Sequence, residues 1–255
     1  MRVWCTFEIT GAYNPLKIKE FIIKLSYKEG NYNMNISDKK RNLENKLSKF
    51  LSNKQITLGN KDEFKQSAVA VPLIEKNNKL SLIFEVRSSK LKSQPCEICF
   101  PGGRIDKTDK TPLYAAIRET TEELGIKEEN IIPIGPLDLV VGSIGALVYP
   151  FVVEIDKNSK MNYNKKEVEE IFTVPLSYLL TAIPEYAQIE YSATPVGEFP
   201  FNLLKTTYPK GYNQKIKYKA TFYKYEDYVI WGLTAKILNQ FINVCETILK
   251  KEAIS

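Results

Sequence analysis

Residues 100–126 read FPGGRIDKTDKTPLYAAIRETTEELGI, a glycine-containing loop followed by a segment with helical character. Pro112 suits the first turn of a helix, where its missing amide is not needed, and Gly125 suits a helix end. No other proline or glycine lies between these two residues. The sequence therefore predicts a helix from about Pro112 to Leu124.

Three carboxylates share one face of this predicted helix. Glu119, Glu122 and Glu123 are separated by steps that return to nearly the same direction around a helix axis. Mainly apolar residues point the other way, toward a core: Leu113, Ala116, Ile117, Thr120 and Leu124. Like charges at this spacing repel each other by roughly a few tenths of a kcal/mol per pair. Such a cluster indicates a positive partner among the acids.

A divalent cation is the partner that best fits these oxygen ligands. Mg²⁺ binds a few carboxylates together with the phosphates of a substrate. The Gly102 and Gly103 backbone lacks Cβ atoms, so it can approach a ligand closely and offer a carbonyl to the metal. A solvated acidic helix face is the alternative, but the Gly-Gly loop, Arg118 and the closing Gly125 favour the metal site.

The same residues resemble the Nudix box, in which a glycine is followed by Arg-Glu-x-x-Glu-Glu-x-Gly and an apolar residue. Arg118-Glu119, Glu122-Glu123 and Gly125-Ile126 match it outright. The Gly103-to-Arg118 interval is one residue longer than the general pattern, and the loop acid is Asp106 or Asp109 instead of glutamate.

The resemblance implies an α/β (α+β) protein with the Nudix fold, a mixed β-sheet sandwiched between helices. It further implies a pyrophosphohydrolase that uses Mg²⁺ or Mn²⁺. The expected metal ligands are the Gly103 carbonyl, Glu119, Glu122 and Glu123, and Arg118 is expected to hold the carboxylates by charge-assisted hydrogen bonds. Gly102 is expected to contact the substrate.

The catalytic base must be a group other than imidazole, because the chain contains no histidine. That absence also excludes Ser-His-Asp catalysis and histidine-ligated zinc. The candidates are Glu119, Glu122 and Glu170. Glu170 lies in a glutamate-rich stretch before Val174-Pro175, and a solvated entry to a short helix is its alternative role.

Residues 87–100, immediately before the Gly-Gly loop, also carry a resemblance. Arg-Ser, Leu-Lys and Glu-x-x-Phe-Pro-Gly-Gly resemble the signature of the coenzyme A pyrophosphatase branch of the Nudix family. Lys92 replaces its usual arginine and Cys96 its usual glycine. The resemblance implies cleavage of coenzyme A (CoA) or acyl-CoA to 3′,5′-ADP and 4′-(acyl)phosphopantetheine, with Arg87, Lys90 and Lys92 contacting the phosphates.

Two alternatives remain open at this point. One is a Nudix pyrophosphatase for another nucleoside diphosphate derivative, such as ADP-ribose, NADH or a dinucleotide. The other is a non-catalytic Nudix module that binds a nucleotide. The intact Arg118, Glu119, Glu122 and Glu123 favour catalysis.

Composition sets broader limits. The 255-residue chain is 44% hydrophobic and has a formal net charge of +6, spread over scattered lysines. The sequence has no dense stripe of basic and aromatic residues of the kind that indicates nucleic-acid binding. It also has no apolar stretch that approaches the ~20 residues of a membrane span. We expect a soluble cytoplasmic enzyme with a small nucleotide substrate and no membrane partner, and leave open a homodimer. The Cys96–Cys99 pair lacks further ligands for zinc.

Three regions are expected along the chain. Residues 1–33 would form an N-terminal extension, unless translation begins at Met34; residues 34–60 a helix and linker; and residues 61–250 the hydrolase domain. The expected elements are a helix over 37–51, strands over 68–74, 80–87, 131–141, 146–155 and 216–225, and a terminal helix from Glu226. Residues 185–209 are expected to form an ordered loop or short strands covering a pocket.

Overall fold

The computed structural model describes residue 41 and residues 44–49, 58–142, 145–203 and 214–252. The chain divides into two units, Met1–Leu58 and Gly59–Ser255. In the first unit, residues 41 and 44–49 are helical, which agrees with part of the helix expected over 37–51. The proposed extension over 1–33 and the Met34 start lie outside the described residues.

A hairpin of β1 (Lys65–Lys76) and β2 (Lys79–Arg87) forms the centre of the second unit. Asn77 and Asn78 both have positive φ, 52° and 58°, which suits a tight two-residue turn between twisted strands. Both strands predicted here are confirmed. β1 also pairs in parallel with β7 (Ala146–Ile155), so the sheet is mixed.

Eight strands make up this sheet, whose main path runs β3-β2-β1-β7-β5. The remaining bounds are β3 (Ile98–Cys99), β4 (Gly102–Arg104), β5 (Ile131–Pro136), β6 (Val140–Val141) and β8 (Val168–Pro175). β4 pairs with β1, β6 with β7, and β8 with β2. The run expected as one strand over 131–141 is thus split into β5 and β6.

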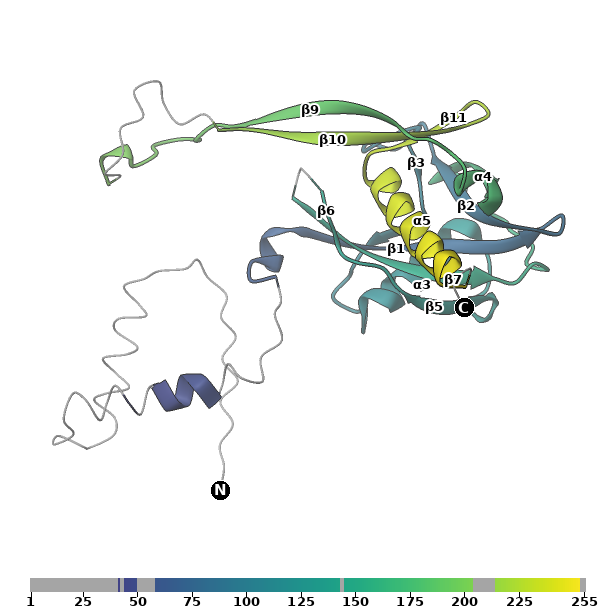
Figure 1. Ribbon diagram of the computed structural model, residues 1–255, viewed down its shortest axis with the longest axis horizontal. Helices are drawn as coiled ribbons and strands as arrows, with labels where there is room; N and C mark the ends of the chain where they lie inside the picture. Colours follow the sequence, from purple (N-terminus) through teal and green to yellow (C-terminus); the bar gives the residue numbers. More distant parts are fainter. Residues whose placement is uncertain (1–40, 42–43, 50–57, 143–144, 204–213, 253–255) are drawn as a thin grey trace. The chain divides into compact units, whose positions relative to one another are not determined.

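Helices cover both faces of the sheet (Figure 1). Strand residues alternate between the two faces. Ala70, Ile74 and Ile83 pack with Leu124 of α3 (Pro112–Leu124) on one face. Val71, Leu82 and Phe84 pack with Leu238 and Phe241 of α5 (Gly232–Glu252) on the other. The predicted sandwich of a mixed sheet between helices is confirmed.

The helix α3 begins and ends as the sequence predicts. Thr111 caps it by accepting the Tyr114 amide at 3.1 Å, Pro112 occupies the first turn, and Gly125 ends it with φ 63°. Its buried residues include Ala116, Thr120 and Leu124, as expected, and also Glu123.

Two corrections concern the later part of the chain. Residues expected as the start of the terminal helix form β11 (Tyr228–Trp231), and α5 begins only at Gly232, whose φ is 65°. The glutamates 169 and 170 belong to β8, and not to a helix entry; the short helix after Pro175 is α4 (Leu176–Leu179).

A second sheet of three antiparallel strands has the order β11-β10-β9. β9 (Glu185–Ala193) and β10 (Gln214–Tyr225) form a ribbon that runs away from α5 and β11 (Figure 1). The expected strand over 216–225 is confirmed, and β9 replaces the loop or short strands expected after residue 185. The described residues also include the short 3₁₀ turns η1 (Lys61–Glu63), η2 (Glu128–Asn130) and η3 (Phe201–Leu203). Among the described helices, none is long and apolar enough to cross a membrane.

Candidate active site on α3 and the Gly-Gly strand

The short strand β4 brings the Gly-Gly loop against the carboxylates of α3. A Cβ atom built on Gly103 would overlap the Glu119 carboxylate, so that carboxylate lies directly against the glycine backbone. The Gly102 amide donates a hydrogen bond of 2.7 Å to Glu123 Oε2. Gly102 has φ 151°, and a Cβ there would meet the backbone of Ala68 and Val69. Both glycines are therefore required by close approach of neighbouring protein atoms, and their predicted contact with a ligand stays a prediction.

Arg118 contacts both the acids of α3 and the acids of the preceding loop. Its guanidinium donates to both carboxylate oxygens of Asp109 at 3.0 Å and to Glu119 Oε1 at 2.9 Å, and lies 3.6 Å from Glu122. The structure thus selects Asp109, whose side chain is 1% exposed, as the principal loop acid, while Asp106 lies 3.9 Å away and is 65% exposed. Hydrogen bonding to Arg118 lowers the pKa of Asp109, and the same bond raises the pKa of Arg118.

The acids of α3 differ in burial. Glu122 is 55% exposed at its side chain, Glu119 is 19% exposed, and Glu123 is only 5% exposed as a residue. Burial raises the pKa of Glu119, an effect opposed by its hydrogen bond to Arg118. Burial, aided by the charge of Glu85, raises the pKa of Glu123 to about 9.

Glu85 is a site residue that the sequence analysis missed. It lies on β2, is 1% exposed, and accepts a hydrogen bond of 3.1 Å from the Cys99 thiol. Burial raises its pKa to about 7, and its other oxygen, Oε2, is buried without a hydrogen-bond partner among the described residues. An acid inside the apolar run Leu82-Ile83-Phe84 was the available signal.

The structure moves the candidate for the base from Glu170, on β8, to Glu167, which directly precedes β8. Glu170 pairs with Val86 on the α5 face of the sheet, and its Oε1 accepts a 2.6 Å hydrogen bond from the Tyr228 hydroxyl. Glu85, one residue away on β2, faces α3 instead. The charge of Glu167, by contrast, raises the pKa values of Glu85 and Glu119, so Glu167 lies near the acids. Glu170 is therefore a poor candidate for a base that acts at α3.

Of the three expected phosphate contacts, Arg87 is the one that the structure brings to the acids. It is half-buried, and its charge lowers the pKa values of Glu85 and Glu123. Its Nε is buried and has no hydrogen-bond partner among the described residues. Lys90 and Lys92 are exposed in the loop that follows. Cys96, at the position of the usual glycine, has φ 61°, a conformation that favours glycine.

A match to a NUDIX domain model covers residues 64–195, slightly more than half of the chain. The chain belongs to the Nudix family. It is 31% identical over 179 residues to the Nudix hydrolase NudL of Photorhabdus laumondii, a match that spans 70% of this chain and 84% of that protein. The Nudix chain described here is therefore a hydrolase of this family.

Other relatives of this Nudix protein match it over shorter spans. It is 42% identical over 113 residues to the peroxisomal coenzyme A diphosphatase NUDT7 of Mus musculus, covering 44% of this chain and 48% of that protein. The chain thus matches about half the length of this relative. An Ap4A hydrolase of C. elegans aligns over 44% of this chain and 80% of its own, with 18% identity and a TM-score of 0.38.

The donor set on α3 fits a divalent cation in chemistry. Glu119, Glu122 and the Gly103 backbone offer hard oxygen ligands side by side. Among the described side chains, no three carboxylates or thiols are already grouped to hold an ion. The contacts explain why: Arg118 pairs with Glu119 and Glu122, and the Gly102 amide holds Glu123. An entering cation would compete with Arg118 for these oxygens.

Proposed function

We propose that the protein hydrolyses the diphosphate bond of CoA or acyl-CoA, giving 3′,5′-ADP and 4′-(acyl)phosphopantetheine. The single observation that carries this proposal is the packing of Glu119 against the Gly103 backbone beside Arg118, directly after the CoA-type segment 87–100. The 42% identity to a coenzyme A diphosphatase over 113 residues supports the same substrate class.

Glu119, Glu122, Glu123 and the Gly103 carbonyl would hold Mg²⁺ or Mn²⁺. When bound, such an ion neutralises diphosphate charge and lowers the pKa of a coordinated water. Arg118 keeps the Glu119 and Glu122 carboxylates in place by its bonds to Asp109, which anchor the guanidinium. The Asp109 side chain in this anchor is only 1% exposed.

The base that takes a proton from the attacking water would be a carboxylate close to the α3 acids. Glu119 and Glu122 remain candidates from the sequence, and Glu167 replaces Glu170. Glu167 is exposed, and its backbone carbonyl accepts the Ser88 amide at 2.8 Å, which fixes it beside the loop after β2. Arg87, Lys90 and Lys92 belong to the same loop region and would contact the substrate phosphates.

The test is product analysis by mass spectrometry after incubating the full chain and Mg²⁺ with CoA, ADP-ribose, NADH and a dinucleoside polyphosphate in separate reactions. We expect 3′,5′-ADP with 4′-phosphopantetheine from CoA. Cleavage of only the other substrates would overturn the CoA assignment and leave a Nudix hydrolase of different specificity. A loss of all cleavage would overturn the catalytic role itself.

A further inference from the structure

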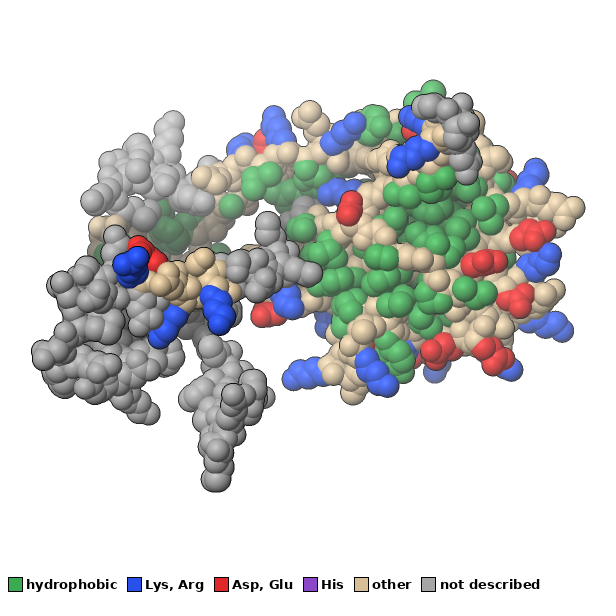
Figure 2. All heavy atoms as spheres, turned by 60° about the horizontal axis from the view of Figure 1, so that its bottom comes forward, with side chains coloured by type: hydrophobic (Ala, Val, Ile, Leu, Met, Phe, Trp, Pro, Cys, Tyr) green, Lys and Arg blue, Asp and Glu red, His purple; other side chains and the backbone are tan. Residues whose placement is uncertain are grey.

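Glu85 is a buried acid on the face of the sheet that α3 covers. Residues two apart on a strand lie on the same face, and Ile83, two residues before Glu85 on β2, packs with Leu124 of α3. Glu85 therefore points toward the helix that carries Glu123. It is 1% exposed and lies outside the stretch that resembles the Nudix box. On the face of the molecule drawn in Figure 2, by contrast, acidic side chains lie apart from one another at the surface.

The strand β3 and the residues after it also bring Glu85 close to Glu123. Cys99 of β3 pairs with Glu85, and its thiol donates a hydrogen bond of 3.1 Å to Glu85 Oε1. Three residues later, the Gly102 amide donates to Glu123 Oε2 at 2.7 Å. The two carboxylates thus flank one short segment. The charge of Glu85 raises the pKa of Glu123, and the charge of Glu119 raises that of Glu85, which agrees with this placement.

One oxygen of Glu85 lacks a partner in either protonation state. Oε2 is buried and has no hydrogen-bond partner among the described residues. A proton on Oε2 would itself need an acceptor, and a proton on Oε1 would leave Oε2 as it is. Arg87 does not supply the partner, because its Nε is buried and equally unpaired within the part of the chain that the structure describes. Since buried polar atoms nearly always have a partner, this oxygen indicates a ligand.

The groups around this oxygen fit a hard divalent cation. Glu85 Oε2 and the Glu123 oxygen that Gly102 does not hold are donors of the kind that Mg²⁺ and Mn²⁺ prefer. The Cys99 thiol is a poor ligand, because burial raises its pKa well above its ordinary value and a thiol binds metal as the thiolate. The carboxylates of Glu85, Glu119 and Glu123 would repel an anion.

The acids of α3 provide a way into this buried position. Glu122 is exposed, Glu119 is mostly buried, and Glu123 and Glu85 are almost completely buried. Carboxylates therefore follow one another from the surface of α3 inward to β2. A cation that reaches Glu119 is already next to the acids that surround Glu85.

We propose that Glu85 and Glu123 hold a second divalent cation, separate from the one expected at Glu119, Glu122 and the Gly103 carbonyl. Glu123 would contribute to both sites. Two bound ions can stabilise both the attacking and the leaving oxygen of a displacement at phosphorus. The inference rests on the proposed cation site of α3, and it does not depend on which diphosphate is cleaved.

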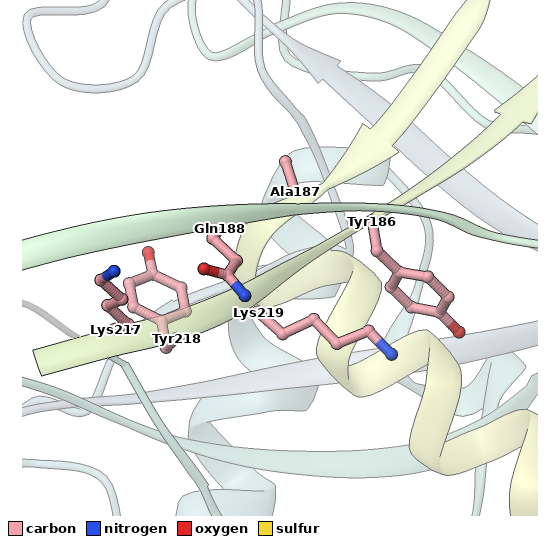
Figure 3. Close-up of a pocket in the computed structure, with 6 residues that line it drawn as sticks. All are labelled: Tyr186, Ala187, Gln188, Lys217, Tyr218 and Lys219. Carbon is pink, nitrogen blue, oxygen red and sulfur yellow. The ribbon is translucent and has the colours of Figure 1, made fainter.

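The hollow on the ribbon of β9 and β10 is a surface where a cation is not expected. It encloses about 360 Å³, and its lining includes Lys217 and Lys219. Figure 3 shows Lys219 reaching toward Tyr186, and its ammonium lies 3.2 Å from the centre of that ring. Because lysines repel a divalent cation, a second bound ion would not be located in this hollow.

The number of Mn²⁺ ions bound per chain tests the proposal. Electron paramagnetic resonance measures free Mn²⁺ while the full chain is titrated in the absence of substrate. The wild type should bind two ions, and Glu85→Gln, which keeps the shape of the side chain without its charge, should bind one. Glu75→Gln is the matched control and should bind two. Glu75 lies on the same hairpin, but its side chain is 49% exposed and pairs with Lys157.

The outcomes separate this proposal from the proposed function. A wild type that binds one ion, or a folded Glu85→Gln that still binds two, would overturn the second site. If Glu85→Gln does not fold, Glu85→Asp should bind two ions, with at least tenfold weaker binding of the second; unchanged affinity would overturn the proposal. CoA cleavage with one bound ion would remove only the second site. Two bound ions without CoA cleavage would support the second site and overturn the substrate assignment.

Discussion

The α3 site and the ribbon of β9 and β10 (Glu185–Ala193 and Gln214–Tyr225), called the arm below, organise their charges in opposite ways. On α3, Glu119, Glu122 and Glu123 are held near one another around Arg118, and burial raises the pKa values of Glu119 and Glu123. On the arm, Glu190 pairs with Lys215 and Lys219 lies over Tyr186. Charges kept together at an electrostatic cost indicate chemistry, whereas locally paired charges indicate a solvated surface. The following predictions test that contrast.

The largest effect is expected from replacing the α3 carboxylates proposed to hold the cation. Glu122→Gln and Glu123→Gln should each lower kcat by ~100-fold or more, the scale of losing a principal electrostatic contact. Glu190→Gln on the arm should leave kcat within about twofold, because its contacts are local. Steady-state kinetics with CoA measures all three. Near-normal turnover in both α3 variants would contradict the expected difference in kcat between substitutions on α3 and on the arm.

Alanine substitutions at the two glycines of β4 should affect activity and stability differently. In Gly103→Ala the new methyl group meets the flexible end of Glu119, so kcat should fall by ~10-fold while thermal unfolding changes little. In Gly102→Ala it meets the Ala68 and Val69 backbone at a positive φ, so the free energy of unfolding should fall by about 1–3 kcal/mol. Equal losses of stability in both would contradict the placement of Glu119.

A smaller effect is expected in the loop after β2. Lys92→Ala should raise KM for CoA by about fivefold with little change in kcat, since an exposed cation contributes modestly to phosphate binding. Lys217→Ala on the arm is the matched control. An unchanged KM in Lys92→Ala would count against a substrate contact at this residue.

The smallest effect concerns the pH dependence of stability in EDTA. The folded protein retains the Glu85 proton up to a pKa of about 7, whereas the unfolded chain releases it near 4.5. The folded state therefore binds more protons between these values, and stability falls as pH rises from 4.5 to 7. Glu85→Gln should flatten that decline by a few degrees of Tm, leaving the further decline toward pH 9 caused by Glu123. Parallel Tm profiles would contradict the burial of Glu85.

Local signals were sufficient for the α3 helix and its loop. Pro112, Gly125 and the spacing of the glutamates lie within one short stretch, so periodicity and end signals predicted the bounds. The acids supplied by neighbouring strands could not be found in this way. Glu170 points to the α5 face because it pairs with Val86, whereas Glu167 lies just before β8, next to the register shift between Val86 and Arg87. This explains why Glu170 was chosen in place of Glu167.

β11 and the full length of β9 were missed for a related reason. Val229, Ile230 and Leu233 have spacing compatible with a helix, but Tyr228–Trp231 pairs with β10, and Gly232 separates the strand from α5. Pairing between distant residues overrides local periodicity. The arm itself follows from the pairing of β9 with β10, which no motif in either segment specifies.

The most direct test of the central claim is a measurement of Mn²⁺ binding by electron paramagnetic resonance. It compares the wild type with Glu119→Gln in the absence of substrate. The claim is that the carboxylates of α3 hold a divalent cation beside Gly103. We predict saturable binding by the wild type and at least tenfold weaker binding by Glu119→Gln, with Glu190→Gln unchanged. Equal Mn²⁺ affinity in the wild type and Glu119→Gln would contradict the account.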